Sequence, residues 1–314
     1  MGDGKSAGGQ RFRQSVTSPV PVMTRAVFLA AFAAVVIWSG GPVATKLAVN
    51  ELPVWTVAIL RTCLGGVIAL PLVLGLGLPF PRQTKQIALL IGSALSSYVA
   101  FPLLFCFGMM HTSGTHGVMI LAFLPVLTGF MAHVSDHRFP HRLWWLGCLI
   151  ALAGEFLLLS TANVTAQSTT LLGDPLVFAA TFFLALGYVT GGHLTRSGCP
   201  AQGTAYWTVV IGSLVLSPAI PFVLTGPDLA SASAVAWASI AYLAIGVTVV
   251  GYILWFWAMA RGGISEVGLM QFLQPISGVL LAHILLGEPL SLLLLASAAL
   301  VIGGIAIANR DKAG

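Results

Sequence analysis

Long apolar runs separated by short polar segments follow one another along this chain from residue 26 to residue 308. A helix rising about 1.5 Å per residue needs roughly 20 residues to cross the hydrocarbon core of a bilayer, and each run approaches that length. The runs are continuously apolar, which favours helices over the alternating strands of a membrane barrel. We therefore predict an all-α integral membrane protein with ten transmembrane helices, at 26–45, 54–76, 86–108, 114–133, 143–161, 175–194, 204–224, 235–258, 265–285 and 290–308.

The second half of this pattern repeats the first at an offset of 150 residues. WSGGPVATK at 38–46 falls on YVTGGHLTR at 188–196, and Pro125 falls on Pro275. Each copy would hold five spans, and an odd number makes the second copy enter the membrane from the opposite side. Inverted repeats of this kind build alternating access in secondary transporters, with the solute site near the midplane between the halves. We predict two inverted five-helix repeats, at 25–161 and 174–309, with a linker at 162–173.

Composition agrees with the apolar pattern, because 57% of the residues are hydrophobic and only 7% are charged. The mean hydropathy of the chain is +0.96. Such a chain cannot present an ordinary hydrated surface, so its outer surface is expected to face a lipid bilayer.

The placement of lysine and arginine predicts the orientation, because basic residues resist translocation across a membrane. If the N-terminus is inside, twelve of the fourteen basic residues lie on the cytoplasmic side, Lys46 lies in an external loop and Arg61 lies within the second span. Both termini are then cytoplasmic, in a multi-pass protein of the bacterial inner (cytoplasmic) membrane. This topology accounts for the sequence pI of about 9.3, so no nucleic-acid partner is predicted.

The two ends of the chain are polar. Residues 1–24 have too little apolar surface to fold, and we expect a disordered cytoplasmic tail there, with a second short tail at 310–314. A secretory signal is rejected, because the apolar run that follows is too long and belongs to the internal repeat.

Motifs for catalysis or for a metal are missing from the sequence. The four cysteines form no CxxC pair, which argues against a disulfide framework or a zinc site. The chain contains neither an HExxH metal pair nor a GxSxG elbow, and Asp174 lacks the second intramembrane aspartate that an aspartyl protease needs. We therefore expect a protein that is not an enzyme and that uses no cofactor or metal.

Aromatic residues in the middle of the spans are the main candidates for a solute site. Tyrosine and tryptophan carry polar atoms that need partners away from water, so mid-span examples favour the bundle interior, as packing or as the lining of a solute cavity. These residues are Trp38, Tyr98, Phe101, Tyr188, Tyr252 and Trp255. A second set lies near span ends and is typical of an interfacial aromatic belt: Trp55, Trp144, Trp145, Trp207 and Trp237.

Three further residues complete the candidate substrate site: His116, Met119 and Gln274. His116 and Glu266 are equivalent in the two repeats, and hydration near the membrane surface explains them as well as a role does. The Gln274 amide could bind a solute or satisfy carbonyls freed by Pro275.

Glycines in equivalent helices are candidate hinges or gates. Gly40, Gly41 and Pro42 lie in the outer half of the first predicted helix, and Gly191 and Gly192 lie in the inner half of the sixth. Proline removes a backbone hydrogen bond and glycine permits bending, which favours hinges. Close helix packing through small residues is the alternative, and it requires no motion.

Three ionisable residues lie deeper in the predicted spans. Glu155 and His283 have no partner that the sequence identifies. Arg61 is expected to stay charged and to pair with backbone carbonyls, Glu51 or water, or to serve as a structural anchor.

Three segments carry a resemblance to a known family: WSGGPVATKLAVNELPVWTVAILR, LLGDPLVFAATFFLALGY and ARGGISEVGLMQFLQPISGVLLAHILLGEPLS. With these segments the chain resembles a ten-helix member of the drug/metabolite transporter superfamily, of the EamA type, over about residues 26–308. The first repeat departs from the family pattern, with HVSDHRFPHR where a glutamate is expected and with Glu155 in an otherwise apolar fifth helix. Any role of Glu288 is therefore not carried over to the first half.

The resemblance implies a secondary transporter that exports or exchanges small metabolites. Bacterial relatives with this pattern include amino-acid exporters, some of which prefer aromatic amino acids. An aromatic cavity with few buried fixed charges also suits a partly apolar, zwitterionic solute. Lipophilic drugs, nucleobases and sugars are the alternative solutes, and a membrane scaffold or sensor is the alternative outside transport. The oligomeric state is left open, with a monomer among the options.

Overall fold

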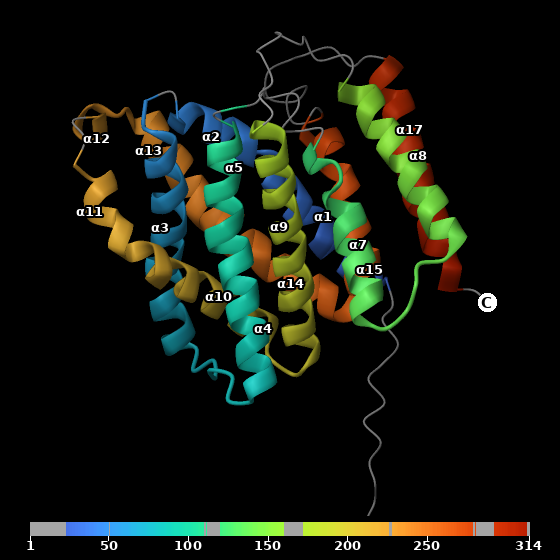
Figure 1. Cartoon of the computed structure of the whole chain (residues 1–314), viewed down its shortest axis with the longest axis horizontal. Coiled ribbons are helices and arrows are strands. Elements are labelled where there is room, and N and C mark those ends of the chain that lie inside the picture. Colours follow the sequence, from blue (N-terminus) through green and yellow to red (C-terminus); the bar gives the residue numbers. More distant parts are fainter. Residues whose placement is uncertain are drawn as a thin grey trace, which may run out of the picture.

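The computed structural model describes residues 23–49, 51–109, 111, 120–159, 172–225, 228–278, 280 and 292–312. Within these residues every regular element is a helix, and most of the helices stand side by side as a bundle (Figure 1). The fold is therefore all-helical, as the apolar pattern predicts. In the part of the chain that the structure describes, five helical stretches are long and apolar enough to cross a bilayer: Val54–Gly75, Thr84–Phe105, Gly173–Arg196, Ala201–Val223 and Ala234–Gly262.

The first half of the chain begins with two consecutive helices, α1 and α2, that are separated at Gly40. Thr24 caps the first helix, because its hydroxyl oxygen accepts the N–H of Val27 at 3.3 Å. The elements are α1 (Arg25–Ser39), α2 (Gly41–Val49), α3 (Val54–Gly75), α4 (Thr84–Ala94), η1 (Leu95–Ala100), α5 (Phe101–Met109), α7 (Leu124–Ser135) and α8 (Arg142–Leu159).

The second half begins with an unbroken helix of 24 residues, α9 (Gly173–Arg196). Gly263, with φ of 98°, separates two of the later helices, because glycine adopts positive φ without strain. The elements after α9 are α10 (Ala201–Leu216), η2 (Ser217–Ala219), α11 (Ile220–Val223), α12 (Asp228–Ser231), α13 (Ala234–Ala241), η3 (Tyr242–Val250), α14 (Gly251–Gly262), α15 (Ile264–Gly268), η4 (Leu269–Leu273), α17 (Leu292–Ala308) and η5 (Asn309–Lys312).

Two of these elements, η1 and η3, are π-helical segments inside longer helices. They end at Ala100 and Val250, which are 150 residues apart and therefore equivalent in the predicted repeat. Insertions of π-helix into α-helices are rare and are frequent at functional sites. Both segments accordingly mark positions where the candidate site can be sought.

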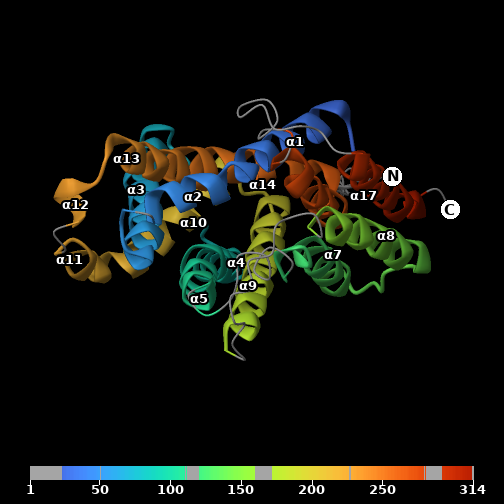
Figure 2. The same ribbon diagram turned by 90° about the horizontal axis from the view of Figure 1, so that it is seen from above.

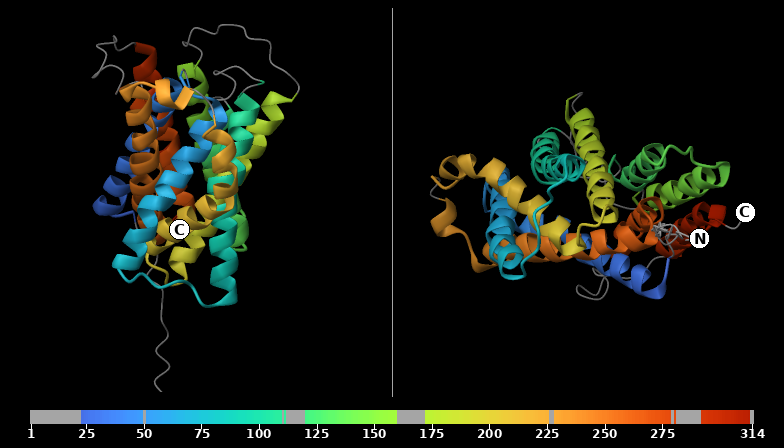
Figure 3. Two further views of the ribbon diagram at one scale, coloured as in Figure 1. Left: turned by 90° about the vertical axis from the view of Figure 1, so that its left-hand side faces the viewer. Right: turned by 90° about the horizontal axis from the view of Figure 1, so that it is seen from below.

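The helices pack in pairs that join the two halves of the chain. Helix α8 packs along α17, α3 packs along α10, α1 and α2 lie against α14 and α13, and α4 and α5 lie against α9. Figure 2 places α8 and α17 at one end of the molecule and α3, α10 and α13 toward the other. The same division is seen from below in Figure 3.

Glycines allow the closest of these contacts. A Cβ added at Gly304 would lie 2.6 Å from the backbone nitrogen of Ala151, and one added at Gly154 would lie 2.9 Å from the carbonyl oxygen of Ser297. Helix α17 therefore packs on α8 backbone to backbone, which small residues permit in membrane helices. The pair runs antiparallel, because the later residue of α8 meets the earlier residue of α17.

Candidate functional site

Five of the predicted aromatic residues meet in the centre of the bundle and form what we call the aromatic cluster. Trp38 comes from α1, Tyr98 from η1, Tyr188 from α9, and Tyr252 and Trp255 from α14. The ring of Trp38 stacks on Tyr188 at 5.5 Å and lies 5.0 Å from Trp255 and 5.4 Å from Tyr252, between ring centroids. Tyr98 reaches the cluster through Tyr252, at 4.9 Å. Residues of both halves thus build one site.

The cluster is shut off from the surface. Its five side chains are between 0% and 6% exposed, and Phe256, 5.7 Å from Tyr252, extends it. Two surface hollows, one lined by five residues at the start of α1 and just before it and one by residues of α3, α11 and α12 with their flanking turns, contain none of the cluster residues. The rings fill the space between the halves, so the solute cavity expected from the sequence is packed closed here.

Polar atoms of the cluster are only partly hydrogen-bonded. Trp38 Nε1 donates to the carbonyl oxygen of Val247 in η3 at 3.0 Å. Trp255 Nε1 has no hydrogen-bond partner, and Tyr98 Oη lies near Thr208 without a hydrogen bond of good geometry. Buried polar groups are normally paired, so these two are candidates to bind a polar group of a solute.

Arg61 of α3 is half-buried beside the cluster. Its positive charge acts on the hydroxyl groups of Tyr98, Tyr188 and Tyr252. The sequence places Arg61 inside a span without showing its neighbours, since its proximity to tyrosines of three other elements is a tertiary feature.

Glycines face two of the cluster rings. A Cβ at Gly251 would collide with the indole of Trp38, and a Cβ at Gly212 would collide with Cβ of Tyr98. Larger residues at these two positions would displace the rings, which makes the glycines part of the site. Neither glycine could be recognised from the sequence, because its contact with a ring depends on how the helices pack.

The remaining predicted substrate residues lie elsewhere. Phe101 stands at the edge of the core and packs on Phe105, with the ring centroids 5.4 Å apart. The carbonyl of Gln274 accepts a hydrogen bond from Ser39 Oγ at 2.9 Å, so Gln274 is linked to the residue after Trp38. His116 and Met119 lie outside the described residues.

The two predicted hinges differ in structure. Helix α1 ends at Ser39 and α2 begins at Gly41, so the first span breaks at Gly40. Helix α9 runs unbroken through Gly191 and Gly192, where Phe256 and Ile264 pack against the missing side chains. Pro42 lies in the first turn of α2. The glycines of α9 therefore have a packing role, and hinge motion at either place stays a prediction.

The predicted interfacial belt needs one correction. Trp144 is only 2% exposed, because its indole packs over Gly129 of α7 and within 5.4 Å of the His133 ring. A position near a span end does not reveal that a neighbouring glycine leaves room for the ring. Trp237, at 37% exposure, remains on the surface.

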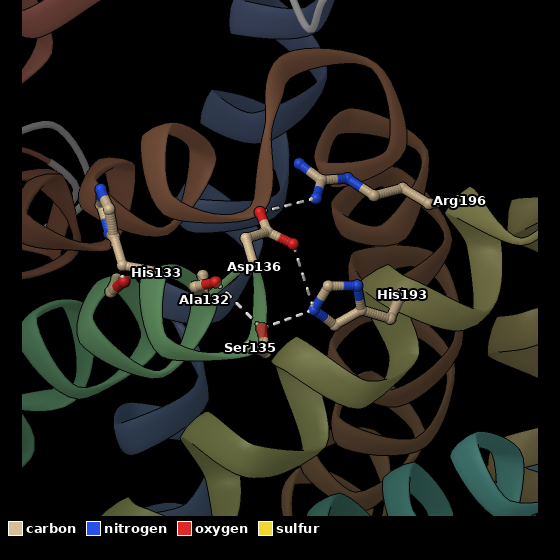
Figure 4. Close-up of polar contacts among 7 residues, drawn as sticks. Ala132, His133, Ser135, Asp136, His193 and Arg196 are labelled. Carbon is tan, nitrogen blue, oxygen red and sulfur yellow. Dashed lines mark hydrogen bonds and ion pairs between the residues drawn. The ribbon is translucent and has the colours of Figure 1, made fainter. Parts of the chain in front are cut away.

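A second polar group, the α7–α9 polar cluster, joins the C-terminal ends of α7 and α9 (Figure 4). Asp136 forms an ion pair with Arg196, with 3.4 Å between Asp136 Oδ2 and Arg196 Nη1, and Asp136 Oδ1 lies 4.0 Å from His193 Nε2. Ser135 Oγ lies 2.7 Å from His193 Nε2 and donates its own proton to the carbonyl of Ala132. When the Ser135 hydroxyl donates to Ala132, it can only accept from His193, which requires a hydrogen on Nε2.

At the other side of the bundle, Glu51 bridges the α2–α3 turn to the start of α13. Its carboxylate accepts the backbone N–H of Ser233 at 2.6 Å and the Ser233 hydroxyl at 2.7 Å. These two hydrogen bonds, the backbone one first, lower the pKa of Glu51 below its ordinary value of 4.5. Gln86 and Ser197 make a comparable bridge between α4 and the end of α9, at 3.1 Å.

Known proteins resemble this chain over most of its length. The EamA-like transporter family matches it twice, over residues 25–160 and 171–310. The uncharacterized transporter YdeK of Bacillus subtilis is 31% identical over 283 residues, which cover 89% of this chain and 95% of YdeK. A probable amino-acid metabolite efflux pump of Salmonella typhimurium is 27% identical, covering 91% of this chain and 95% of the pump. A solved crystal structure with 18% identity shares the fold, with a TM-score of 0.74 over 90% of this chain and 98% of its own.

Proposed function

Because the chain belongs to the EamA-like transporter family and is a transporter, we propose that it exports amino acids, aromatic ones included, out of the cytoplasm. The relative from Salmonella typhimurium carries the name of a probable amino-acid metabolite efflux pump, which supports this class of solute. The observation that carries the proposal is the aromatic cluster, built from both halves at the centre of the bundle.

The chemistry of the cluster suits such a solute. The stacked rings of Trp38 and Tyr188, with Trp255 tilted against both, offer aromatic surface to an aromatic or large apolar side chain. Arg61, beside the tyrosines, offers a positive charge to a carboxylate. Unpaired Nε1 of Trp255 adds a donor. A zwitterion with an apolar side chain can use all three features at once.

Alternating access between two inverted repeats is the mechanism that we propose. Equivalent residues of the two halves meet each other, as expected beside a twofold axis: Trp38 stacks on Tyr188, and Ser213 Oγ donates to the Cys63 carbonyl at 3.4 Å. The Cys63 thiol points back at the Ser213 carbonyl, 3.9 Å away. Contacts in which a residue meets its own equivalent in the other half are typical of twofold interfaces. They support an axis in the membrane plane through the cluster.

The topology that we propose places both termini in the cytoplasm of a bacterial cell and the protein in the inner membrane, with ten crossings. Twelve of the fourteen basic residues then lie inside. The α7–α9 polar cluster would face the cytoplasm and the Glu51–Ser233 bridge the outside. Reporter fusions at the two ends check this, and an external signal from either one rules out the ten-span topology.

Efflux from proteoliposomes tests the function. Vesicles containing the purified protein are loaded with labelled phenylalanine, tryptophan, leucine or glutamate, and with uracil or glucose as representatives of the other solute classes. We expect faster release of phenylalanine and tryptophan than from protein-free vesicles, with little release of the sugar. If only uracil or glucose is released, that solute class replaces amino acids in the proposal. If no labelled solute is released, the result counts against a transport function.

A further inference from the structure

Glu155 is, among the described residues, the one acidic side chain buried in the protein. It lies on α8, is 2% exposed, and its Oε2 atom makes no hydrogen bond. The aromatic cluster and the α7–α9 polar cluster make no use of it. An ionisable group inside a membrane helix is costly and is a functional candidate by default.

The surroundings of Glu155 are apolar. Its neighbour Gly154 lies against the backbone of α17 at Ser297, and its neighbour Phe156 packs on Phe123, with ring centroids 6.1 Å apart. Helix α17 (LLLLASAALVIGGIAIA) and segment η4 (LMQFL), both packed on α8, contain no titratable residue.

Titratable and charged groups on the other elements around α8 lie toward its opposite end. His133 of α7 contacts Trp144 in the first turn of α8. Arg310 lies two positions after Ala308, the residue of α17 that meets Gly147 near the start of α8. On α8 itself, Cys148 lies two turns, about 10 Å, before Glu155, and Arg142 is farther still. No described counter-charge therefore stands ready to hold Glu155 as a carboxylate, and the neutral acid is the stable form.

Segment η4 connects this region to the aromatic cluster. It is a 3₁₀ segment that packs on α8, α17 and α1. Gln271 within it is 3% exposed, and neither atom of its side-chain amide group is hydrogen-bonded. Gln274, just after it, accepts the hydrogen bond from Ser39, which is adjacent to Trp38. A 3₁₀ stretch between helical segments often marks a hinge, so movement at Glu155 has a short mechanical route to Trp38.

We propose that Glu155 is the proton-binding site that couples inward proton movement to solute export. The inference rests on the proposed function. In the proposed topology, helix α8 begins at the cytoplasmic side with Arg142. Glu155 is thirteen residues farther along the helix, a rise of about 20 Å, and therefore lies nearer the outer face. External water delivers a proton to the carboxylate and an O–H bond forms. When α8 and η4 separate toward the cytoplasm, that bond breaks and the proton passes to internal water, which restores the carboxylate.

Two measurements test the proposal with Glu155→Gln, a neutral mimic of the acid form. Infrared spectra of the purified protein should contain the carbonyl band of a buried carboxylic acid that is lost in Glu155→Gln and kept in Ser297→Ala, a buried polar control on α17. In proteoliposomes loaded with labelled phenylalanine, an imposed pH gradient should accelerate wild-type efflux at least tenfold. Glu155→Gln should lose that acceleration and keep gradient-independent exchange within about twofold. Glu155→Asp should restore part of it.

Unchanged gradient-driven efflux in Glu155→Gln would overturn the proposal, and so would an infrared spectrum in which no band depends on Glu155. If the wild-type protein moves no amino acid, the proposed function fails, and the infrared arm still decides whether Glu155 holds a proton. A well-folded Glu155→Gln protein that loses exchange as well as the gradient effect would assign Glu155 to structure.

Discussion

Trp38 is held in the aromatic cluster by two different interactions. Its ring stacks nearly parallel on Tyr188, at an interplanar angle of 7°, and its N–H donates to Val247 O. The acceptor belongs to the π-helical segment η3, where the ladder of α-helical hydrogen bonds is interrupted. One residue thus links α1 of the first half to α9 and η3 of the second.

Replacing Trp38 should separate its packing role from its transport role. Trp38→Ala removes a buried ring, which costs about 3–5 kcal/mol in protein cores, and it should lower both folded protein and phenylalanine efflux. Trp38→Phe keeps the stack and loses the hydrogen bond, at about 0.5–1.5 kcal/mol, and should fold normally. We expect Trp38→Phe to lower efflux per folded molecule severalfold. Efflux that merely follows the amount of folded protein in both variants would make the ring structural only.

Tyr98 gives a parallel test in which the ring is kept. Tyr98→Phe removes a buried hydroxyl that lacks a hydrogen bond of good geometry, so stability should change little or rise. If that hydroxyl binds a polar group of the solute, the KM for phenylalanine efflux should rise several-fold while the thermal midpoint holds. An unchanged KM would remove Tyr98 Oη from the solute site.

Glu51 provides a prediction about pH. Its lowered pKa means that the ionised carboxylate favours the bridge to Ser233, so the stabilisation is present above the ordinary pKa of 4.5 and is lost as the pH falls through the lowered value. Wild type should therefore unfold at a slightly higher temperature than Glu51→Gln at pH 7, and the difference should shrink as the pH falls below 4.5 and through the lowered pKa of Glu51. A difference between the two proteins that does not change with pH would contradict the bridge.

At the scale of the secondary-structure elements, two contacts of charged side chains between the halves lie at helix ends. The α7–α9 polar cluster joins two helix C-termini, whereas the Glu51–Ser233 bridge joins a turn to a helix start. These contacts lie at the two faces of the bundle with the aromatic cluster between them. Such an arrangement fits a site closed from both sides.

The ion pair between Asp136 and Arg196 is expected to act as the inner latch. Both side chains are partly exposed, so the pair contributes about 0.2–1 kcal/mol, which changes the ratio of open to closed states by up to about fivefold. Asp136→Asn and Arg196→Gln should each raise internal thiol labelling of a cysteine placed at Ser97. In a double-mutant cycle, the double variant should label no faster than either single variant. Purely additive effects would show that the two side chains act independently.

The whole molecule can be described as two halves that meet through equivalent residues. Besides Trp38 with Tyr188 and Cys63 with Ser213, helix α8 meets α17 through Gly154 at Ser297, and the equivalent pairing brings Gly147 to Gly304. Equivalent contacts on both sides of one axis are hard to produce without the repeat.

A cross-link tests this axis. Ser213→Cys would stand beside native Cys63, in a protein whose other cysteines are replaced by alanine or serine. A protease site is inserted at 162–173, between the two halves. Oxidation or a short thiol linker should join the two thiols, so that the halves stay together after the protease has cut the chain. Ser213→Ala is the matched control and should separate into two fragments. Fragments that separate in both variants would place Cys63 and Ser213 too far apart for the proposed axis.

Much of this arrangement can be predicted from the sequence, because apolar length and the 150-residue repeat are properties of the chain itself. The five cluster residues follow from one rule, that a mid-span Trp or Tyr needs an interior partner. The α7–α9 polar cluster could not be predicted from the sequence, because Asp136 and His193 are 57 residues apart and meet only through helix packing. The closed state of the site is also invisible in sequence, since the same rings could line an open cavity.

The central claim is that the aromatic cluster opens alternately to the two sides of the membrane. The most direct measurement uses Ser97→Cys, beside Tyr98 and 3% exposed in the wild type, as the single cysteine in a cysteine-free protein. Membrane-impermeant thiol reagents are applied from inside or from outside, with and without phenylalanine. Slow labelling from each side, with phenylalanine changing both rates, is the result that alternating access predicts. A folded protein whose cysteine is labelled from neither side, or always from one side only, would contradict it.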